Sequence, residues 1–260
     1  MVYRIIQYLK YRLQAKDEHS IHSPFLFELY CSAFLSSGSY YIFNDFNLLR
    51  QRLLNKKREF VEVNDLGAGS QKLRTSTRTV AQIAKYSVKQ KKYAELLFKL
   101  VNRFKPKTII ELGTSLGLTT MHLAYPQKNA KVHTIEGCEN IATIAQQHFS
   151  DYHFENIDSI TGNFDSCLPN LLSTISTVDF MFFDGNHQKE ATINYFLLCL
   201  EKANEDSVFV FDDIYWSKGM TEAWKYIKSH PKVTQTIDIY QLGIVFFRQS
   251  LTKEDFVLRY

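Results

Sequence analysis

The chain of 260 residues is 45% hydrophobic and 14% aromatic, which is enough to build a sizeable core. No run of about 18 uncharged apolar residues occurs, and the first residues lack the apolar core of a signal peptide. We therefore expect no membrane partner and a cytoplasmic location. The four cysteines are scattered without a metal-binding pattern, which is typical of reduced thiols.

The net charge of +4 conceals opposite charges in the two halves of the chain. Residues 1–107 carry 20 Lys and Arg against 8 Asp and Glu, whereas residues 108–260 carry 11 against 19. Two interpretations remain open: solvated helix faces, or a basic surface for an anionic partner such as RNA. The sequence has no zinc module and no RNA-binding signature, so nucleic acid is the less favoured partner.

The N-terminal region predicts helices. Apolar residues recur there at helical spacing, namely Ile5, Ile6, Leu9 and Leu13. Ser23-Pro24 is a start signal for a second helix, and Asp45 is placed to cap a third. Residues 71–79 are polar and basic and predict a loop. Two further helices are expected near 78–88 and 90–104.

From residue 106 onward the pattern alternates between strands and helices. The predicted strands are 107–111, 131–136, 157–161, 178–183 and 207–212. The predicted helices between them lie near 117–125, 139–149, 165–173 and 188–203. This order argues for a parallel sheet covered by helices on both faces. After a helix near 219–229, the β-rich runs 233–240 and 243–248 predict a hairpin.

The fold class that follows is α/β. We expect a doubly wound, Rossmann-like, seven-stranded and mostly parallel sheet that ends in a C-terminal antiparallel hairpin. We expect residues 1–75 to form an N-terminal helical extension or lid, and residues 76–260 to form the main domain.

A glycine-rich turn follows the first strand of the alternating region. Glu111 ends that strand, and Gly113 and Gly117 permit a tight turn before a helix whose free N–H groups favour a polar or anionic ligand. Glu136 ends the next strand, where a carboxylate can accept two ribose hydroxyls. A plain strand–turn–helix junction is the alternative. The similar segment Asp65–Ser70 has no second strand ending in an acid after it, so we interpret it as a lid at most.

Acidic residues also end the next two predicted strands. Asp184 and His187 follow one strand, and Asp212 and Asp213 follow the other. Because the carboxyl ends of parallel strands share one edge of a sheet, these carboxylates are expected to converge there. They would repel one another unless a cation such as Mg²⁺ lay between them. The alternative is that some of them only cap helices.

The ordered set of motifs resembles that of the class I S-adenosylmethionine-dependent methyltransferases. The segments are Glu111-Leu-Gly-Thr-Ser-Leu-Gly117, Thr134-Ile-Glu136, Phe183-Asp184-Gly-Asn-His187 and Asp212-Asp213-Ile-Tyr-Trp216. The branch they resemble is that of the metal-dependent O-methyltransferases related to catechol and caffeoyl-CoA enzymes. The resemblance covers about residues 78–249.

This resemblance implies S-adenosylmethionine as the methyl donor. Its methionine part would lie against the glycine-rich turn, its ribose on Glu136, and its adenine beside the residues after the third strand. The implied cofactor-binding residues are Glu111, Gly113, Ser115, Gly117, Thr119, Glu136, Gly137, Asn163, Phe164 and Asp184.

The resemblance also implies a metal centre and an acceptor pocket. Asp184, Asp212 and Asp213 would bind Mg²⁺ or a similar divalent cation, although the family more often has Asn where Asp213 stands. His187 stands in place of the family's catalytic Lys and, with Asp184, is the catalytic candidate. Tyr215 and Trp216 would line the acceptor pocket.

The implied reaction is methyl transfer from S-adenosylmethionine to a hydroxyl oxygen of a small molecule, and the family pattern allows a homodimer. Two other functions remain as alternatives. One is an RNA or other anionic-substrate methyltransferase or binding protein that uses the basic N-terminal half. The other is a dinucleotide-dependent oxidoreductase.

Overall fold

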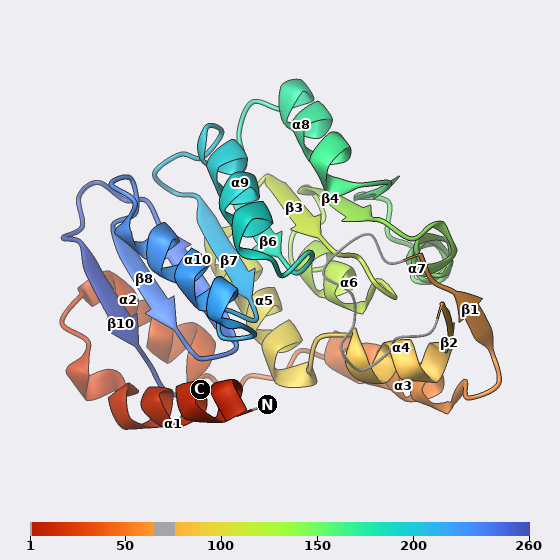
Figure 1. The fold of residues 1–260 in the computed structure, drawn as a ribbon, viewed down its shortest axis with the longest axis horizontal. Helices are drawn as coiled ribbons and strands as arrows, with labels where there is room; N and C mark the ends of the chain where they lie inside the picture. The colour runs from red at the N-terminus through yellow and green to blue at the C-terminus, as the bar shows by residue number, and fades with distance from the viewer. Residues whose placement is uncertain (1, 65–75) are drawn as a thin grey trace. The chain divides into compact units, whose positions relative to one another are not determined.

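The structure is a computed structural model that describes residues 2–64 and 76–260 (Figure 1). The chain divides into two compact units. Unit 1 combines residues 1–36 with residues 172–260, and unit 2 comprises residues 37–171. The segment Asp65–Ser70, interpreted above as a lid, lies outside the described residues. Among the described helices, none has the length and apolar character needed to cross a bilayer.

Unit 2 alternates helices and strands after a helical start. Its elements are α3 (Ile42–Asn55), β1 (Phe60–Glu62), β2 (Thr77–Thr79), α4 (Val80–Tyr86), α5 (Lys91–Phe104), β3 (Thr108–Leu112), α6 (Leu118–Ala124), β4 (Lys131–Glu136), α7 (Glu139–Asp151) and β5 (Ile157–Thr161). Helix α8 (Phe164–Thr174) runs across the boundary of the unit. The predicted strands and helices of this part agree with the structure to within a few residues.

The strands of unit 2 that matter for the site are parallel. β4 pairs with β3 on one side and with β5 on the other, in register from Glu111 opposite Thr134 to Glu136 opposite Thr161. Figure 1 shows β3 and β4 side by side. The carboxyl ends of all three strands therefore lie at one edge, as the alternating pattern predicts.

Two local predictions in unit 2 are wrong. Helix α3 begins at Ile42, so Asp45 lies in its first turn and does not cap it. Residues 77–79 form β2, which pairs antiparallel with β1, where a loop was expected. Tertiary contacts explain this pairing. Val61 of β1 and the nearby Val63 are buried in the apolar cluster that α3 and α4 share with α6 and α7, and β2 pairs with the strand that this cluster holds in place.

Unit 1 combines the N-terminal helices with the last strands. Its elements are α1 (Val2–Gln14), the short helices η1 (Glu18–Ser20) and η2 (Tyr30–Phe34), α2 (Pro24–Leu29), β6 (Phe180–Phe183), α9 (Lys189–Leu200), β7 (Val208–Asp212), α10 (Lys218–Ser229), β8 (Gln235–Asp238), β9 (Leu242–Phe246) and β10 (Glu254–Val257). Pro24 opens α2 after the Ser23 cap, as predicted.

The strand order in unit 1 is β10-β8-β9-β7-β6. β6 and β7 are parallel, β9 is antiparallel to both β7 and β8, and the predicted C-terminal hairpin is confirmed. β10 runs parallel to β8 and was not expected. Counting β3 to β10, the described residues hold eight such strands, one more than the seven predicted. The α/β class and the mostly parallel sheet with its antiparallel hairpin are confirmed.

The first and last segments of the chain are held together within unit 1. The Tyr11 hydroxyl donates to the Leu258 carbonyl over 2.8 Å, and the Tyr30 hydroxyl donates to the Arg259 carbonyl over 2.6 Å. The Ser23 hydroxyl donates to the Gln235 side chain in β8 over 3.1 Å. In Figure 1, α1 and α2 accordingly lie next to β10 and β8. The N-terminal helices are thus an integral part of unit 1.

Candidate functional site

The glycine loop, residues 113–117 in unit 2, adopts left-handed backbone conformations. The φ angles are 99° at Gly113, 49° at Ser115 and 80° at Gly117. A Cβ atom on Gly117 would come within 2.6 Å of the Phe149 ring, so only glycine fits there. The predicted turn is therefore present, and the position of the Phe149 ring explains why residue 117 is a glycine.

Glu136 fastens this loop to the end of β4. The backbone N–H of Ser115 donates to one carboxylate oxygen over 2.9 Å, and the backbone N–H of Cys138 donates to the other over 3.1 Å. The side chain is half-buried. A carboxylate at the end of this strand is the kind of acceptor that two ribose hydroxyls require.

Glu111 lies beneath the loop and is fully buried. The hydroxyls of Thr120 and Thr134 donate to its Oε2 over 2.5 Å and 2.7 Å. Its Oε1 is buried with no hydrogen-bond partner among the described residues. Burial therefore raises the pKa of Glu111 to about 7, although the two threonines favour the ionised form. These threonines were missed in the sequence, where the only signal was polar residues in otherwise buried segments.

A Glu111→Gln variant is expected to be more stable than the wild type above pH 7. The unfolded carboxyl loses its proton near its ordinary pKa of 4.5, whereas the folded one keeps it up to about 7. The folded state thus binds more protons in this window, and wild-type stability falls as the pH rises through it. The difference amounts to about 3 kcal/mol at most. Gln keeps an oxygen for the two threonines and does not ionise.

Thermal unfolding across this pH range measures the effect. The difference between variant and wild type is expected to close as the pH falls toward 4.5. The exposed Glu155→Gln variant is the control and is expected to follow the wild type at every pH. A constant difference across the range would contradict a raised pKa for Glu111.

The remaining residues assigned to the cofactor lie around the same strand ends. Thr119 is buried in the first turn of α6, and the buried hydroxyl of Ser115 has no hydrogen-bond partner among the described residues. Gly137 lies between β4 and α7. Asn163 accepts the Asp165 backbone N–H over 2.9 Å at the start of α8, which Phe164 opens. Asn163 therefore has a helix-capping role whatever it binds.

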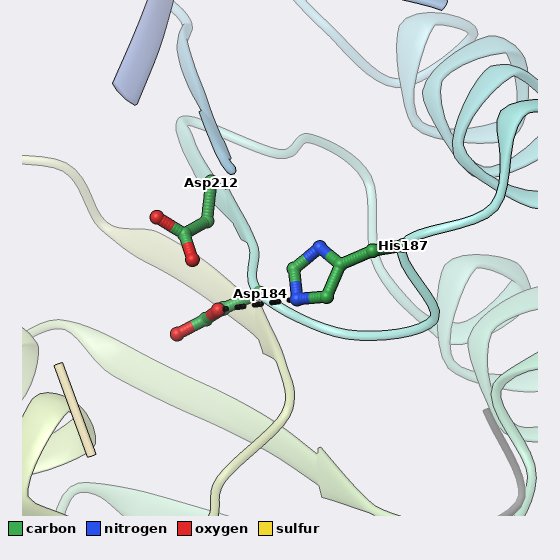
Figure 2. A group of neighbouring side chains, drawn as sticks. All are labelled: Asp184, His187 and Asp212. Atoms are coloured by element: carbon green, nitrogen blue, oxygen red, sulfur yellow. Dashed lines mark ion pairs between the residues drawn. The ribbon is translucent and has the colours of Figure 1, made fainter. Parts of the chain in front are cut away.

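The acidic cluster of unit 1 consists of Asp184, His187 and Asp212 (Figure 2). One ligand atom of each residue lies within 4.8 Å of the others. The His187 Nε2 and an Asp184 carboxylate oxygen are 3.8 Å apart. Asp212 is almost fully buried, and the other two side chains are half-buried. Figure 2 shows the two carboxylates facing each other with the imidazole directed at Asp184.

The parallel register of β6 and β7 creates this cluster. Phe183 lies opposite Phe211, and their rings stack at 4.2 Å. The next residue on each strand is an aspartate, so the apolar pairing brings Asp184 and Asp212 to equivalent positions at one edge. His187 reaches them from the loop before α9.

Asp213 is not among the residues of this cluster. Its backbone has a φ of 52°, and its backbone N–H donates to the Gln241 carbonyl over 2.8 Å. The Gln241 side-chain amide donates to its carboxylate. Asp213 is therefore tied to the turn between β8 and β9. The sequence alone gave no means of separating the two neighbouring aspartates.

Tyr215 and Trp216 follow the cluster in the chain. The Tyr215 hydroxyl donates to Asp238 over 2.5 Å, and burial beside this carboxylate raises the pKa of the phenol. The centroids of the Trp216 and His187 rings are 6.5 Å apart. The Arg4 guanidinium of α1 lies over the Trp216 ring, 4.4 Å from its centroid. Arg4 is thus a neighbour of the site that sequence spacing could not reveal.

Comparisons with known proteins point to one enzyme class. Residues 110–214 match a family model described as a methyltransferase domain. An uncharacterized protein of Acanthamoeba polyphaga mimivirus, R132, is 28% identical over 129 residues. That match covers 45% of this chain and 57% of the viral protein, so the chain spans little more than half of that relative.

Solved structures similar to this chain include several methyltransferases. A protein described as a caffeoyl-CoA O-methyltransferase from Staphylococcus aureus has a TM-score of 0.57 and 20% identity, covering 64% of this chain and 88% of that one. The methyltransferase PaMTH1 of Podospora anserina, bound to S-adenosylhomocysteine (SAH), has a TM-score of 0.60 and 12% identity, covering 85% and 93%.

The O-methyltransferase of Bacillus cereus, also in complex with SAH, has a TM-score of 0.54 and 16% identity and covers 83% of this chain and 95% of that one. Identities this low establish a shared fold, and the family match adds a sequence similarity over residues 110–214, which are less than half of the chain. Residues 110–214 are therefore similar in sequence to a methyltransferase domain, and the chain shares its fold with methyltransferases of known structure.

Proposed function

We propose that the chain is an S-adenosylmethionine-dependent methyltransferase that acts on a hydroxyl oxygen of a small molecule, with a divalent cation bound by Asp184, His187 and Asp212. The observation that carries the proposal is the acidic cluster, whose ligand atoms lie within 4.8 Å of one another. The similarity to O-methyltransferases of known structure supports the oxygen acceptor. A bound cation would lower the pKa of an acceptor hydroxyl next to it.

The donor atoms of the cluster fit a divalent cation and bear on its identity. Two carboxylates suit Mg²⁺ and Mn²⁺, whereas imidazole suits ions such as Mn²⁺, Fe²⁺, Co²⁺ and Zn²⁺ better than Mg²⁺. In the family pattern described above, a third oxygen ligand stands at the position of Asp213. Here His187 lies in the cluster and Asp213 does not, so we propose Mn²⁺ or a similar transition ion in preference to Mg²⁺.

This assignment changes the role of His187. If its Nε2 binds the cation, the same nitrogen cannot accept the acceptor's proton, so that proton passes to solvent or to another base. Trp216 and Arg4, at the edge of the cluster, would orient the acceptor. In unit 2, Glu136 would hold the ribose hydroxyls, and the glycine loop would receive the methionine part of the cofactor.

Several basic residues of the N-terminal half are engaged inside the protein. The Arg50 guanidinium donates to the backbone carbonyls of Val88 and Lys89, and both Arg78 and Lys89 are buried. The buried Arg78 and Lys89 side chains do not contribute to a basic surface. Other basic side chains of this half, such as Lys57 and Arg58, are exposed, so the preference for a small-molecule acceptor rests on the similarity to O-methyltransferases.

Calorimetric titration of the full chain with SAH, and separately with NAD, tests the cofactor. Heat of binding is expected only with SAH, and binding of NAD alone would reject methyl transfer. Methyl transfer to a panel of phenols and catechols, with and without a chelator, then tests the acceptor and the cation. We expect turnover to stop in chelator and to return with Mn²⁺. Full turnover in chelator would reject the cation and leave the methyltransferase assignment standing.

A further inference from the structure

Helix α1 exposes the apolar stripe that the helical spacing of its residues indicates. All five aliphatic residues of the stripe are exposed, by 69% at Val2, 53% at Ile5, 45% at Ile6, 57% at Leu9 and 88% at Leu13. At roughly 100° of rotation per residue, these positions form a single face of the helix. Such a continuous exposed aliphatic face marks an interaction site.

The opposite face of α1 is the one that packs against unit 1. Tyr11 is buried and donates its hydroxyl to the Leu258 carbonyl. The Tyr8 ring packs on the Tyr240 ring at 5.1 Å, and the Tyr3 hydroxyl donates to Thr221 over 2.7 Å. Aromatic and polar contacts thus hold the helix in place, and the aliphatic stripe is directed away from unit 1.

Two cations border the stripe. Lys10 and Arg12 are exposed, and at roughly 100° per residue they fall on its two opposite sides. Helix α1 contains no Asp or Glu. An apolar face rimmed by basic side chains is the pattern of helices that lie in the plane of a membrane interface.

We propose that α1 docks the protein on an anionic membrane surface, with the aliphatic stripe among the acyl chains and Lys10 and Arg12 at the headgroups. A second copy of the chain is the less favoured occupant. A two-fold interface brings the same patch of both copies together, so it would place basic borders near basic borders with no acid in α1 to compensate. The absence of a membrane span does not bear on this surface, because interfacial docking needs only one apolar helix face.

Co-sedimentation of the full chain with vesicles tests the proposal. We expect binding to phosphatidylcholine vesicles that contain phosphatidylserine, weaker binding to phosphatidylcholine alone, and a decrease with salt. A Leu9→Gln/Leu13→Gln variant is expected to lose at least about 100-fold in binding, because each leucine buries its side chain in the interface. A Lys10→Gln/Arg12→Gln variant is expected to lose roughly 20-fold on the anionic vesicles only.

A matched control is Leu35→Gln/Leu48→Gln, which changes two comparably exposed leucines elsewhere, at 50% and 55%. We expect this variant to bind vesicles like the wild type. SAH affinity and thermal unfolding are expected to be the same in all the variants. Absence of vesicle binding by the wild type would overturn the proposal. So would light scattering that shows a dimer of the wild type and a monomer of Leu9→Gln/Leu13→Gln, which would assign the stripe to a second copy.

Discussion

An Asp212→Ala variant is expected to lose both the cation and at least about 100-fold in turnover, since a metal ion contributes several kcal/mol to stabilising developing charge. Asp212 is almost fully buried and directed at Asp184, so no solvent-exposed group can replace it. Steady-state methyl transfer measures the loss of activity. Mn²⁺ binding, followed by electron paramagnetic resonance without cofactor or acceptor, measures the loss of the site independently of catalysis.

The neighbouring aspartate provides a matched control. Asp213→Asn keeps the oxygen that accepts from the Gln241 side chain, so the turn at β8–β9 is expected to remain in place. This variant is expected to bind Mn²⁺ and to turn over within a few-fold of the wild type. Equal losses in the two variants would assign the third ligand to Asp213 in place of His187. Retained Mn²⁺ binding in Asp212→Ala would contradict the cluster itself.

A Glu136→Gln variant is expected to bind SAH about 100-fold more weakly. A hydrogen bond to a charged acceptor contributes roughly 1.5–3 kcal/mol, and the variant replaces one charged oxygen by a donor and neutralises the other. The same change leaves the backbone N–H of Ser115 or Cys138 facing an amide group, which loosens the glycine loop. Isothermal titration with SAH measures the affinity.

Glu139→Gln is the appropriate comparison for this variant. Glu139 is exposed in the first turn of α7, three residues after Glu136. The Glu139→Gln variant is expected to bind SAH with the same affinity as the wild type. If both variants weakened SAH alike, the effect would come from the charge of the region and not from the hydrogen bonds of Glu136. An unchanged affinity in Glu136→Gln would place the ribose elsewhere.

Most of the alternating part of the fold could be predicted because each signal is local. The strand before Asp184 is a run of apolar residues, Phe180–Phe183, and all four are buried in β6. The strand β10 escaped prediction because Glu254 and Asp255 are poor strand formers, and pairing with β8 is what makes this segment extended. The exposure of the apolar stripe of α1 could not be predicted for a related reason. Periodicity reveals an apolar face but does not say whether anything covers it.

Some residues of the candidate site could likewise be predicted from local sequence signals, whereas others depend on contacts between distant parts of the chain. Strand ends and glycines are encoded locally, so Glu111, Gly117 and Asp184 could be selected from the sequence. The different directions of Asp212 and Asp213 depend on a left-handed residue and a contact with Gln241, which is 28 positions away from Asp213. The approach of Arg4 to Trp216 joins residues more than two hundred positions apart, and no spacing rule can anticipate it.

The contacts that hold the N-terminal helices to the end of the chain have a consequence for biosynthesis. Unit 2 is continuous in sequence, so its strands β3, β4 and β5 can form while the chain is still being made. Tyr11 and Tyr30 leave the ribosome first, yet their acceptors belong to Leu258 and Arg259. The N-terminal helices therefore wait for more than two hundred residues, with the aromatic face of α1, which includes Tyr8 and Tyr11, uncovered. A nascent chain of this kind is a natural client for chaperones that hold apolar segments until the C-terminal strands arrive.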